Sequence, residues 1–245
     1  MRAVAVIPAR MGSTRCPGKV LAEINGRPMV SCVWEQAMAA TLVDRVVVAT
    51  DSDEIETAIR RMGGEVIRTK GTFDSGSDRV ASVLDGLDAD LVINVQADNP
   101  DIDPATIDAV VRSFDDPTIQ VATPVAPFPE ALDPRDPSKV KVVVSEDGRA
   151  MYFSRLAVPF GGPWLLHIGV YGFRPALLRQ FAGWGRGSIE GAEQLEQLRL
   201  LEHGVSIHAV VVEQATVGVD TPADLERFQA QTSFVVQNTL PNLRL

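Results

Sequence analysis

The sequence has few cysteines and no long apolar run, and both absences narrow its class. Cys16 and Cys32 are its two cysteines among 245 residues. They are too few for a disulfide framework, and no cysteine–histidine spacing fits a zinc site, so we expect a reducing, cytoplasmic setting. No stretch of about 18 apolar residues indicates a membrane span. No basic segment followed by an apolar run indicates a signal peptide.

Positive charge is also scarce, except at the start of the chain. The net charge of −9 makes nucleic acids and membrane surfaces poor candidate partners. Residues 1–20 contain no acidic side chain but carry four cations: Arg2, Arg10, Arg15 and Lys19. This basic segment predicts a focused site for a small anion, although chance clustering of surface charge explains the same pattern.

Short apolar runs alternate with helical patterns up to about residue 118. The apolar runs predict strands at 3–8, 45–50, 65–69 and 91–95. The segments between and after them predict helices at 28–40, 52–62, 78–87 and 104–114. Continuous Val/Ile runs are typical of strands covered on both faces, and the alternation is typical of parallel βαβ units. Such sheets bind their ligands at the carboxyl ends of the strands.

The stretch 118–174 is strand-like and has no long helical pattern, with Asp147-Gly148 at the tip of a predicted hairpin. It is expected to add antiparallel strands to the same sheet. Helices are predicted again at 175–183, 189–203 and 221–231, with a strand at 205–213. No repeat or flexible linker divides the chain. The sequence therefore predicts one α/β domain over 1–229, with a mostly parallel central sheet and an inserted β-rich lobe. A tail without clear pattern follows at 230–245.

A loop rich in glycine and cations, ARMGSTRCPGKV (9–20), follows the first predicted strand. Glycine lets backbone N–H groups approach an anion, and Arg and Lys side chains neutralise phosphate oxygens. The loop is not a P-loop, because Gly12 and Gly18 are one residue too far apart and Val20 follows Lys19. A phosphate-binding loop of another kind is the better interpretation.

This loop resembles the opening loop of CMP-sugar synthetases, in particular the 3-deoxy-manno-octulosonate (Kdo) cytidylyltransferase family. Further matches follow in the same order over about residues 1–229: ATDSDEI, DSGSDRVA, NVQADNP, KVV, YFSR, HIGVYGFR, EQLEQLR and VGVDTPADLERF. The resemblance implies a GT-A-like nucleotidyltransferase fold, CTP and an acidic sugar as substrates, Mg²⁺ as cofactor, and a homodimer formed through the β-rich lobe.

The resemblance also implies a reaction in which CMP passes from CTP to Kdo or a Kdo-like acid and pyrophosphate leaves. Another small acid or sugar acceptor is one alternative, and a P-loop ATPase or kinase is a competing enzyme class. A non-catalytic nucleotide-binding regulatory module is the competing interpretation outside enzymes.

Two aspartates that lie far apart in the sequence each follow a short apolar segment. Asp98 follows LVINV and Asp220 follows ATVGV, so both are expected at one edge of the sheet, where carboxylates can hold Mg²⁺. The resemblance makes both of them metal ligands. Alternatively, Asp220 caps the helix predicted to begin at Thr221.

The resemblance assigns the remaining site residues. Those expected at the nucleotide are Pro8, Ala9, Arg10, Gly12, Ser13, Arg15, Lys19, Thr50, Asp51, Ser75, Gly76, Arg79 and Gln96. Those expected at the sugar are Gln96, Arg155, His167, Tyr171, Glu190 and Glu193, with Arg155 clamping a carboxylate. The catalytic residues are expected to be Arg10, Lys19, Asp98 and Asp220. An ordinary helix start at Ser75-Gly76 and a structural histidine at 167 are the alternatives.

The sequence departs from the family pattern mainly on the sugar side. Leu166 stands where the family usually has arginine, Gly191 where it has histidine, and Asn99 where it has glutamate. The 160–167 connection is also shorter than usual. Two lost charge-assisted hydrogen bonds would weaken Kdo binding unless other residues replace them. We therefore expect either compensation elsewhere in the pocket or an acceptor that differs from Kdo.

Overall fold

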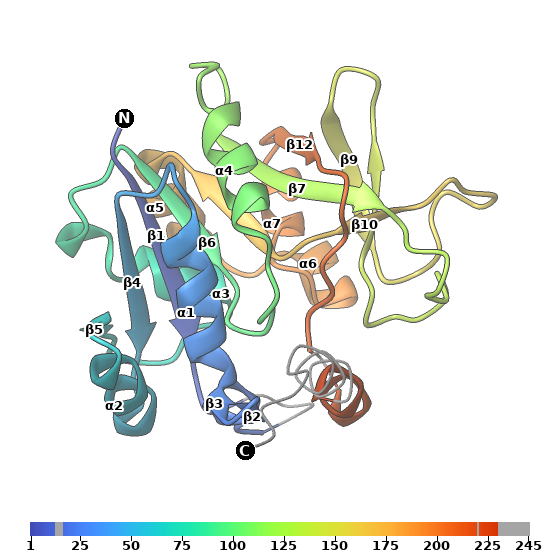
Figure 1. Cartoon of the computed structure of the whole chain (residues 1–245). Coiled ribbons are helices and arrows are strands. Elements are labelled where there is room, and N and C mark those ends of the chain that lie inside the picture. Colours follow the sequence, from blue (N-terminus) through green and yellow to red (C-terminus); the bar gives the residue numbers. More distant parts are fainter. Residues whose placement is uncertain (13–16, 220, 230–245) are drawn as a thin grey trace.

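A ten-stranded sheet runs through the molecule (Figure 1). The computed structural model describes residues 1–12, 17–219 and 221–229. The strands of the sheet are β1 (Ala3–Ala9), β4 (Arg45–Thr50), β5 (Glu65–Arg68), β6 (Leu91–Val95), β7 (Val121–Pro127), β8 (Lys141–Val144), β9 (Arg149–Ser154), β10 (Leu165–His167), β11 (Val170–Phe173) and β12 (Ile207–Val211). Their order is β10-β8-β9-β12-β7-β11-β6-β1-β4-β5. Ser13, Arg15, Asp220 and the tail 230–245 lie outside the described residues.

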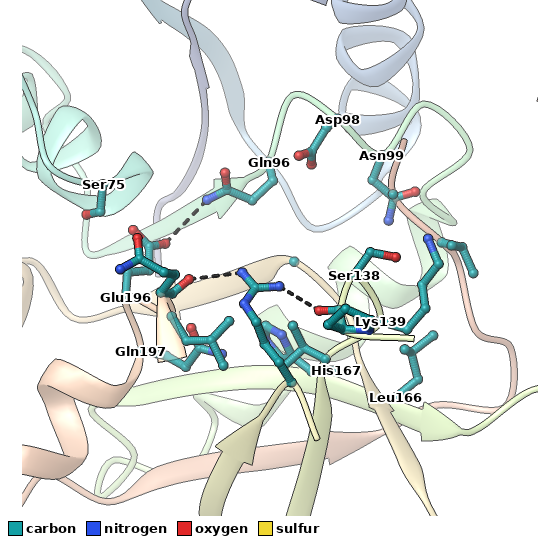
Figure 2. Close-up of a pocket in the computed structure, with 18 of the residues that line it drawn as sticks. Ser75, Gln96, Asp98, Asn99, Ser138, Lys139, Leu166, His167, Glu196 and Gln197 are labelled. Carbon is teal, nitrogen blue, oxygen red and sulfur yellow. Dashed lines mark hydrogen bonds between the residues drawn. The ribbon is translucent and has the colours of Figure 1, made fainter. Parts of the chain in front are cut away.

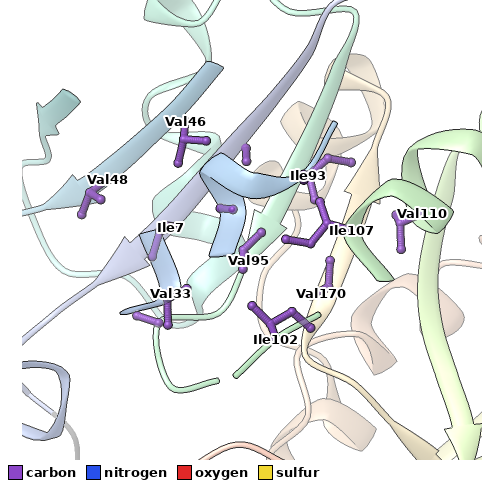
Figure 3. Packing of buried hydrophobic residues seen from close by; sticks show 14 of the residues in the cluster. Ile7, Val33, Val46, Val48, Ile93, Val95, Ile102, Ile107, Val110 and Val170 are labelled. Carbon is purple, nitrogen blue, oxygen red and sulfur yellow. The ribbon is translucent and has the colours of Figure 1, made fainter. Parts of the chain in front are cut away.

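Helices cover both faces of the sheet's N-terminal half, as the continuous apolar runs predict. One face packs against α1 (Met29–Ala39), α2 (Asp53–Arg61) and α4 (Pro104–Ser113). The opposite face packs against α3 (Gly76–Ala81), α5 (Pro175–Gly183) and α7 (Leu198–Glu202). Side chains alternate between the two faces along each strand, so that Ile7 lies with Val33 of α1 and Ile107 of α4 in one cluster (Figure 3).

The prediction of a mostly parallel sheet is wrong, because the sheet is mixed. β5, β4, β1 and β6 are parallel, but β11 lies antiparallel between β6 and β7. The short connection after β8 contains no crossover helix and returns the chain antiparallel as β9, whereas β10 and β11 follow one another along the same edge of β7. β10 pairs with both β8 and β7, so β7, β12, β9, β8 and β10 close into a ring.

The single helix predicted at 189–203 is also wrong. It is interrupted between α6 (Ser188–Glu193) and α7, because Gln194 adopts a left-handed conformation with φ 56°. The helix predicted at 78–87 likewise becomes α3 followed by the 3₁₀ helix η2 (Leu84–Gly86). The break at Gln194 turns residues 194–197 toward a cavity.

Two small elements and a last helix complete the described structure. The strands β2 (Glu23–Ile24) and β3 (Arg27–Pro28) form a hairpin beside the 3₁₀ helix η1 (Lys19–Leu21). Residues 222–229 are helical, within the helix predicted at 221–231. Within the ranges that the structure describes, no helix has the length and apolar character needed to cross a membrane.

Candidate active site

A cavity of about 810 Å³ lies at the carboxyl ends of β1 and β6. It brings together eight of the predicted site residues: Arg10, Ser75, Gln96, Asp98, Arg155, His167, Tyr171 and Glu190. Figure 2 shows Ser75, Gln96 and Glu196 on one side and Asn99, Ser138 and Lys139 on the other, with His167 between them. Segments far apart in the sequence therefore meet where a parallel half-sheet is expected to bind its ligand.

Lys19 ties the phosphate loop to the loop after β6. Its Nζ donates to Asp98 Oδ2 at 2.8 Å and to the carbonyl of Val219 at 2.8 Å. The N–H of Val219 in turn donates to the carbonyl of Asp98 at 2.7 Å. The residue that precedes Asp220 is thus held against Asp98, although residues 215–219 form no strand.

On the predicted nucleotide side, Gly76 lies close to the side chain of Gln96. Gly76 begins α3, and a Cβ there would lie 2.7 Å from Gln96 Nε2. Ser75 caps the same helix by accepting the N–H of Asp78 at 3.1 Å. The first turn of α3 can therefore lie directly against Gln96 in the cavity wall.

Arg79 is buried and does not line the cavity. Its guanidinium donates to Thr69 Oγ1 and, at 3.1 Å, to Asp51 Oδ2, and it lies over the Phe73 ring. These contacts hold the ends of neighbouring elements together. Arg79 therefore contacts residues next to the predicted nucleotide side rather than the cavity itself. Its contact with nucleotide stays a prediction.

Arg155, the predicted carboxylate clamp, donates to three main-chain carbonyls. Nε bonds Glu193 O at 2.7 Å, one terminal nitrogen bonds Pro137 O at 2.8 Å, and the other bonds Gln194 O at 3.0 Å. The guanidinium therefore connects β9 to two loops of the cavity wall. Its role toward a substrate carboxylate stays a prediction.

Glu190, another predicted sugar-side residue, is buried and paired. Its two carboxylate oxygens accept from the Nε and a terminal nitrogen of Arg199, each at 2.8 Å. Arg199 also binds both carboxylate oxygens of Asp78 on α3. This network fixes α6 and α7 against α3 and neutralises the charge of Glu190.

His167 is a neutral hydrogen-bonding group. Thr123 Oγ1 donates to the carbonyl of Val170 at 2.7 Å, so its lone pairs accept from His167 Nε2 at 2.9 Å. This assigns the ring hydrogen to Nε2 and leaves Nδ1 as an acceptor. Burial lowers the pKa of His167 to about 3. The ring therefore contributes an acceptor rather than a positive charge to the cavity.

The comparisons with known proteins agree on one assignment. The cytidylyltransferase family matches residues 4–207. The chain is 41% identical to 3-deoxy-manno-octulosonate cytidylyltransferase of Trichlorobacter lovleyi, over 93% of this chain and 97% of that protein. It is 46% identical to the enzyme of the same name from Methylorubrum populi, over 91% and 93%. The chain belongs to the 3-deoxy-manno-octulosonate cytidylyltransferase family.

Solved structures agree with this membership. The structure of a CMP:2-keto-3-deoxy-manno-octonic acid synthetase complexed with CTP is 40% identical and superposes with a TM-score of 0.89, covering 96% of this chain and all of that one. The 4-diphosphocytidyl-2C-methyl-D-erythritol synthase of Anaerococcus prevotii is 12% identical, covers 95% of this chain and 98% of its own, and shares the fold with a TM-score of 0.64. The predicted α/β nucleotidyltransferase fold is confirmed.

Several residues predicted for this cytidylyltransferase do not line the cavity. They are Pro8, Ala9, Gly12, Lys19, Thr50, Asp51, Gly76, Arg79 and Glu193. Pro8, Ala9 and Thr50 end β1 and β4, and Glu193 accepts from Ser154 Oγ at 2.9 Å and Arg155 N at 3.0 Å. Lys19 reaches the site through Asp98. Ser13, Arg15 and Asp220 lie outside the described residues.

Sequence reasoning about this cytidylyltransferase missed Glu196 and Gln197. Glu196 accepts from Ser77 N and Oγ, each at 3.0 Å, and burial raises its pKa. Gln197 Oε1 accepts from the hydroxyl of Tyr171 at 3.1 Å. Both lie in the EQLEQLR match, but a continuous helix was predicted there, and only the break at Gln194 turns them to the cavity.

The assigned state of His167 predicts a pH dependence for this cytidylyltransferase. The folded-state pKa lies near 3 and the unfolded-state value near 6.5, so between them the unfolded chain binds a proton that the native chain does not. Stability should be full above about pH 6.5 and fall as the pH drops toward 3. His167→Gln should flatten this decline in melting temperature. A ring that titrates near pH 6.5 by NMR in the native protein would contradict the assignment.

Proposed function

We propose that the protein transfers CMP from CTP to Kdo, or to a closely related acidic sugar, and releases pyrophosphate. The observation that supports this most directly is the cavity at the ends of β1 and β6. It joins Arg10, Gln96 and Asp98 in a chain 40% identical to a synthetase complexed with CTP. The acceptor oxygen attacks the α-phosphorus of CTP, the bond from that phosphorus to the β-phosphate oxygen breaks, and pyrophosphate leaves.

The residues of this chain mainly position the substrates and neutralise charge. Arg10 projects from the end of β1 into the cavity, where it can bind phosphate oxygens. Lys19 holds Asp98 in place and contributes a second cation to the same end of the site. Positioning and charge neutralisation are sufficient for phosphoryl-type transfer, which asks for little covalent chemistry from the protein.

The residues present also suit Mg²⁺. Asp98 lines the cavity with a side chain that is 33% exposed, and carboxylate oxygens are the ligands this ion prefers. We assign Asp98 and Asp220 as the residues that would hold it, where it would supply charge stabilisation to the triphosphate. Asp220 lies outside the described residues, and within them no three acidic, histidine or cysteine side chains converge.

The reaction is tested by incubating the protein with CTP, Mg²⁺ and Kdo and measuring pyrophosphate together with the CMP-linked product. A panel of related 3-deoxy keto acids, assayed in parallel, identifies the preferred acceptor. CTP binding without pyrophosphate release from any acid would favour a nucleotide-binding regulatory module. Release of phosphate instead of pyrophosphate would favour an ATPase or kinase.

We also propose a homodimer formed through the β-rich lobe. Met151 on β9, Leu156 and Phe160 are large apolar side chains exposed by 62% or more, all on this lobe. Exposed apolar surface of this kind marks interfaces. Light scattering should give about twice the 26.4 kDa of one chain, and Met151→Glu should give monomers. Met38→Glu, on α1 outside the lobe, should leave the mass unchanged. A monomeric wild type would contradict the proposal.

A further inference from the structure

Four cationic side chains line the described cavity: Arg10, Lys139, Arg155 and Arg186. Lys139 is buried and its Nζ donates to Asp224 Oδ1 at 3.1 Å, while Arg155 donates to three carbonyls. Arg10 lies at the end of β1, on the nucleotide side. Arg186 is exposed and makes no hydrogen bond or ion pair with any described residue. Among the described residues its guanidinium has no partner, so it is available to a ligand in addition to Arg10.

The backbone that carries Arg186 is held firmly. Glu202 accepts from Ser188 Oγ, Ile189 N and Glu190 N at 2.9–3.1 Å. A Cβ on Gly187 would lie 1.9 Å from Glu202 Oε2, so a side chain at this position would displace the Glu202 carboxylate from these hydrogen bonds. Arg186 is thus presented by a fixed turn at the edge of the cavity.

This turn lies close in the chain to Gly191, one of the departures from the family pattern. The N–H of Gly191 donates to the carbonyl of Gly187 at 2.9 Å, which places Gly191 one helical turn beyond the residue next to Arg186. Gly191 stands where the family pattern has a histidine, and a Cβ there would meet nothing within 4 Å. The space around Gly191, where the family pattern has the histidine, is therefore open.

A second donor that lines the cavity has no partner among the described residues. Gln197 is 2% exposed, and its Nε2 makes no hydrogen bond in the described structure, although its Oε1 accepts from Tyr171. A buried amide donor without a partner is costly unless a ligand supplies an acceptor. In the part of the chain that the structure describes, the cavity therefore presents a guanidinium and an amide N–H without partners, and both can donate to anionic oxygen of a ligand.

We propose that Arg186 binds the carboxylate of the acceptor and determines acceptor specificity, in place of the side chains missing at Leu166 and Gly191. The inference rests on the proposed CMP transfer to an acidic acceptor. A guanidinium donates two parallel hydrogen bonds to a carboxylate, which gives both affinity and orientation. Arg155 then supports the cavity wall through its carbonyl bonds, and Arg186 supplies the contact with the acid.

The test compares Arg186→Gln, Arg186→Lys and a control, Arg179→Gln, in steady-state kinetics with both substrates varied. Arg179 is an exposed arginine on α5 that pairs with Asp85 outside the cavity. We expect Arg186→Gln to raise the acceptor KM about 10- to 100-fold, as for loss of a charge-assisted hydrogen bond, with the KM for CTP unchanged. Arg186→Lys should restore part of the affinity, and Arg179→Gln should match the wild type.

A carboxamide analogue of the acceptor completes the test. The wild type should discriminate strongly against it, and Arg186→Gln should lose most of that discrimination. An acceptor KM unchanged in Arg186→Gln, or an equal rise in the KM for CTP, would overturn the inference while the wild type still makes product. A wild type that releases no pyrophosphate with any acid would instead defeat the proposed function.

Discussion

Asp98→Asn should lower kcat by at least about 100-fold while the protein remains folded. The substitution keeps the size of the side chain but removes the negative charge that faces the cavity and pairs with Lys19 at 2.8 Å. Loss of a charged group that acts at the transition state costs a few kcal/mol, and each 1.36 kcal/mol is about tenfold in rate. Steady-state kinetics over a range of Mg²⁺ concentrations measure the effect.

Two alternatives for Asp98 give different results. If it binds Mg²⁺, Asp98→Asn should also raise the Mg²⁺ concentration needed for half-maximal rate, and calorimetry should show weaker Mg²⁺ binding. If it only balances the charge of Lys19, then Lys19→Met and Asp98→Asn should have similar effects, with Mg²⁺ affinity unchanged. Asp85→Asn, an exposed aspartate outside the cavity, is the matched control. Near-normal turnover of Asp98→Asn at limiting Mg²⁺ would exclude it as a ligand.

Local sequence patterns predicted the N-terminal half of the fold closely. The strands at 45–50 and 91–95 have the predicted bounds, and the helix predicted at 104–114 is α4 (Pro104–Ser113). Each is a short periodic segment whose burial is decided by its immediate neighbours along a βαβ unit. The position of β11 between β6 and β7 was not predictable in this way. It depends on pairing between strands far apart in the sequence, and an apolar run such as HIGVYGF carries no information about its direction.

The break in the predicted helix at 189–203 has no sequence signal either. Gln194 takes a left-handed conformation that glycine or asparagine usually occupies, and no proline follows it. Long-range contacts decide the outcome, since carbonyls 193 and 194 both accept from Arg155. This is why Glu196 and Gln197 were missed.

The candidate site was predicted as a group of segments rather than as a set of contacts. The motifs indicated which loops meet, and the cavity does join the ends of β1 and β6 with the segment after β9. The motifs did not indicate which atoms each side chain bonds. Arg155 and Arg186 are both arginines near the sugar side, and only the three-dimensional structure shows that Arg155 donates to three main-chain carbonyls.

Lys141 lies in the KVV match, to which the sequence analysis assigned no role, and we expect it to contribute strongly to stability. It is fully buried on β8, and burial lowers the pKa of its ammonium group. Its Nζ donates to the carbonyls of Asp136, Lys139 and Arg155 at 3.0, 2.5 and 2.6 Å. All three N–H donors of the ammonium are therefore used, and they join the ring of strands to the loop that carries Ser138 at the cavity.

Lys141→Met should destabilise the protein by at least about 3 kcal/mol, because each buried carbonyl left without a donor costs about 1–3 kcal/mol. Methionine keeps the apolar stem, so the loss reports the ammonium group rather than a cavity. Arg149→Met, which removes an exposed cation from the neighbouring strand β9, should change stability by no more than about 0.5 kcal/mol. Urea unfolding of both variants measures the difference. If the free energy of unfolding of Lys141→Met lies within about 1 kcal/mol of the wild-type value, water or a local shift satisfies the three carbonyls. Lys141 would then not be what holds this loop in place.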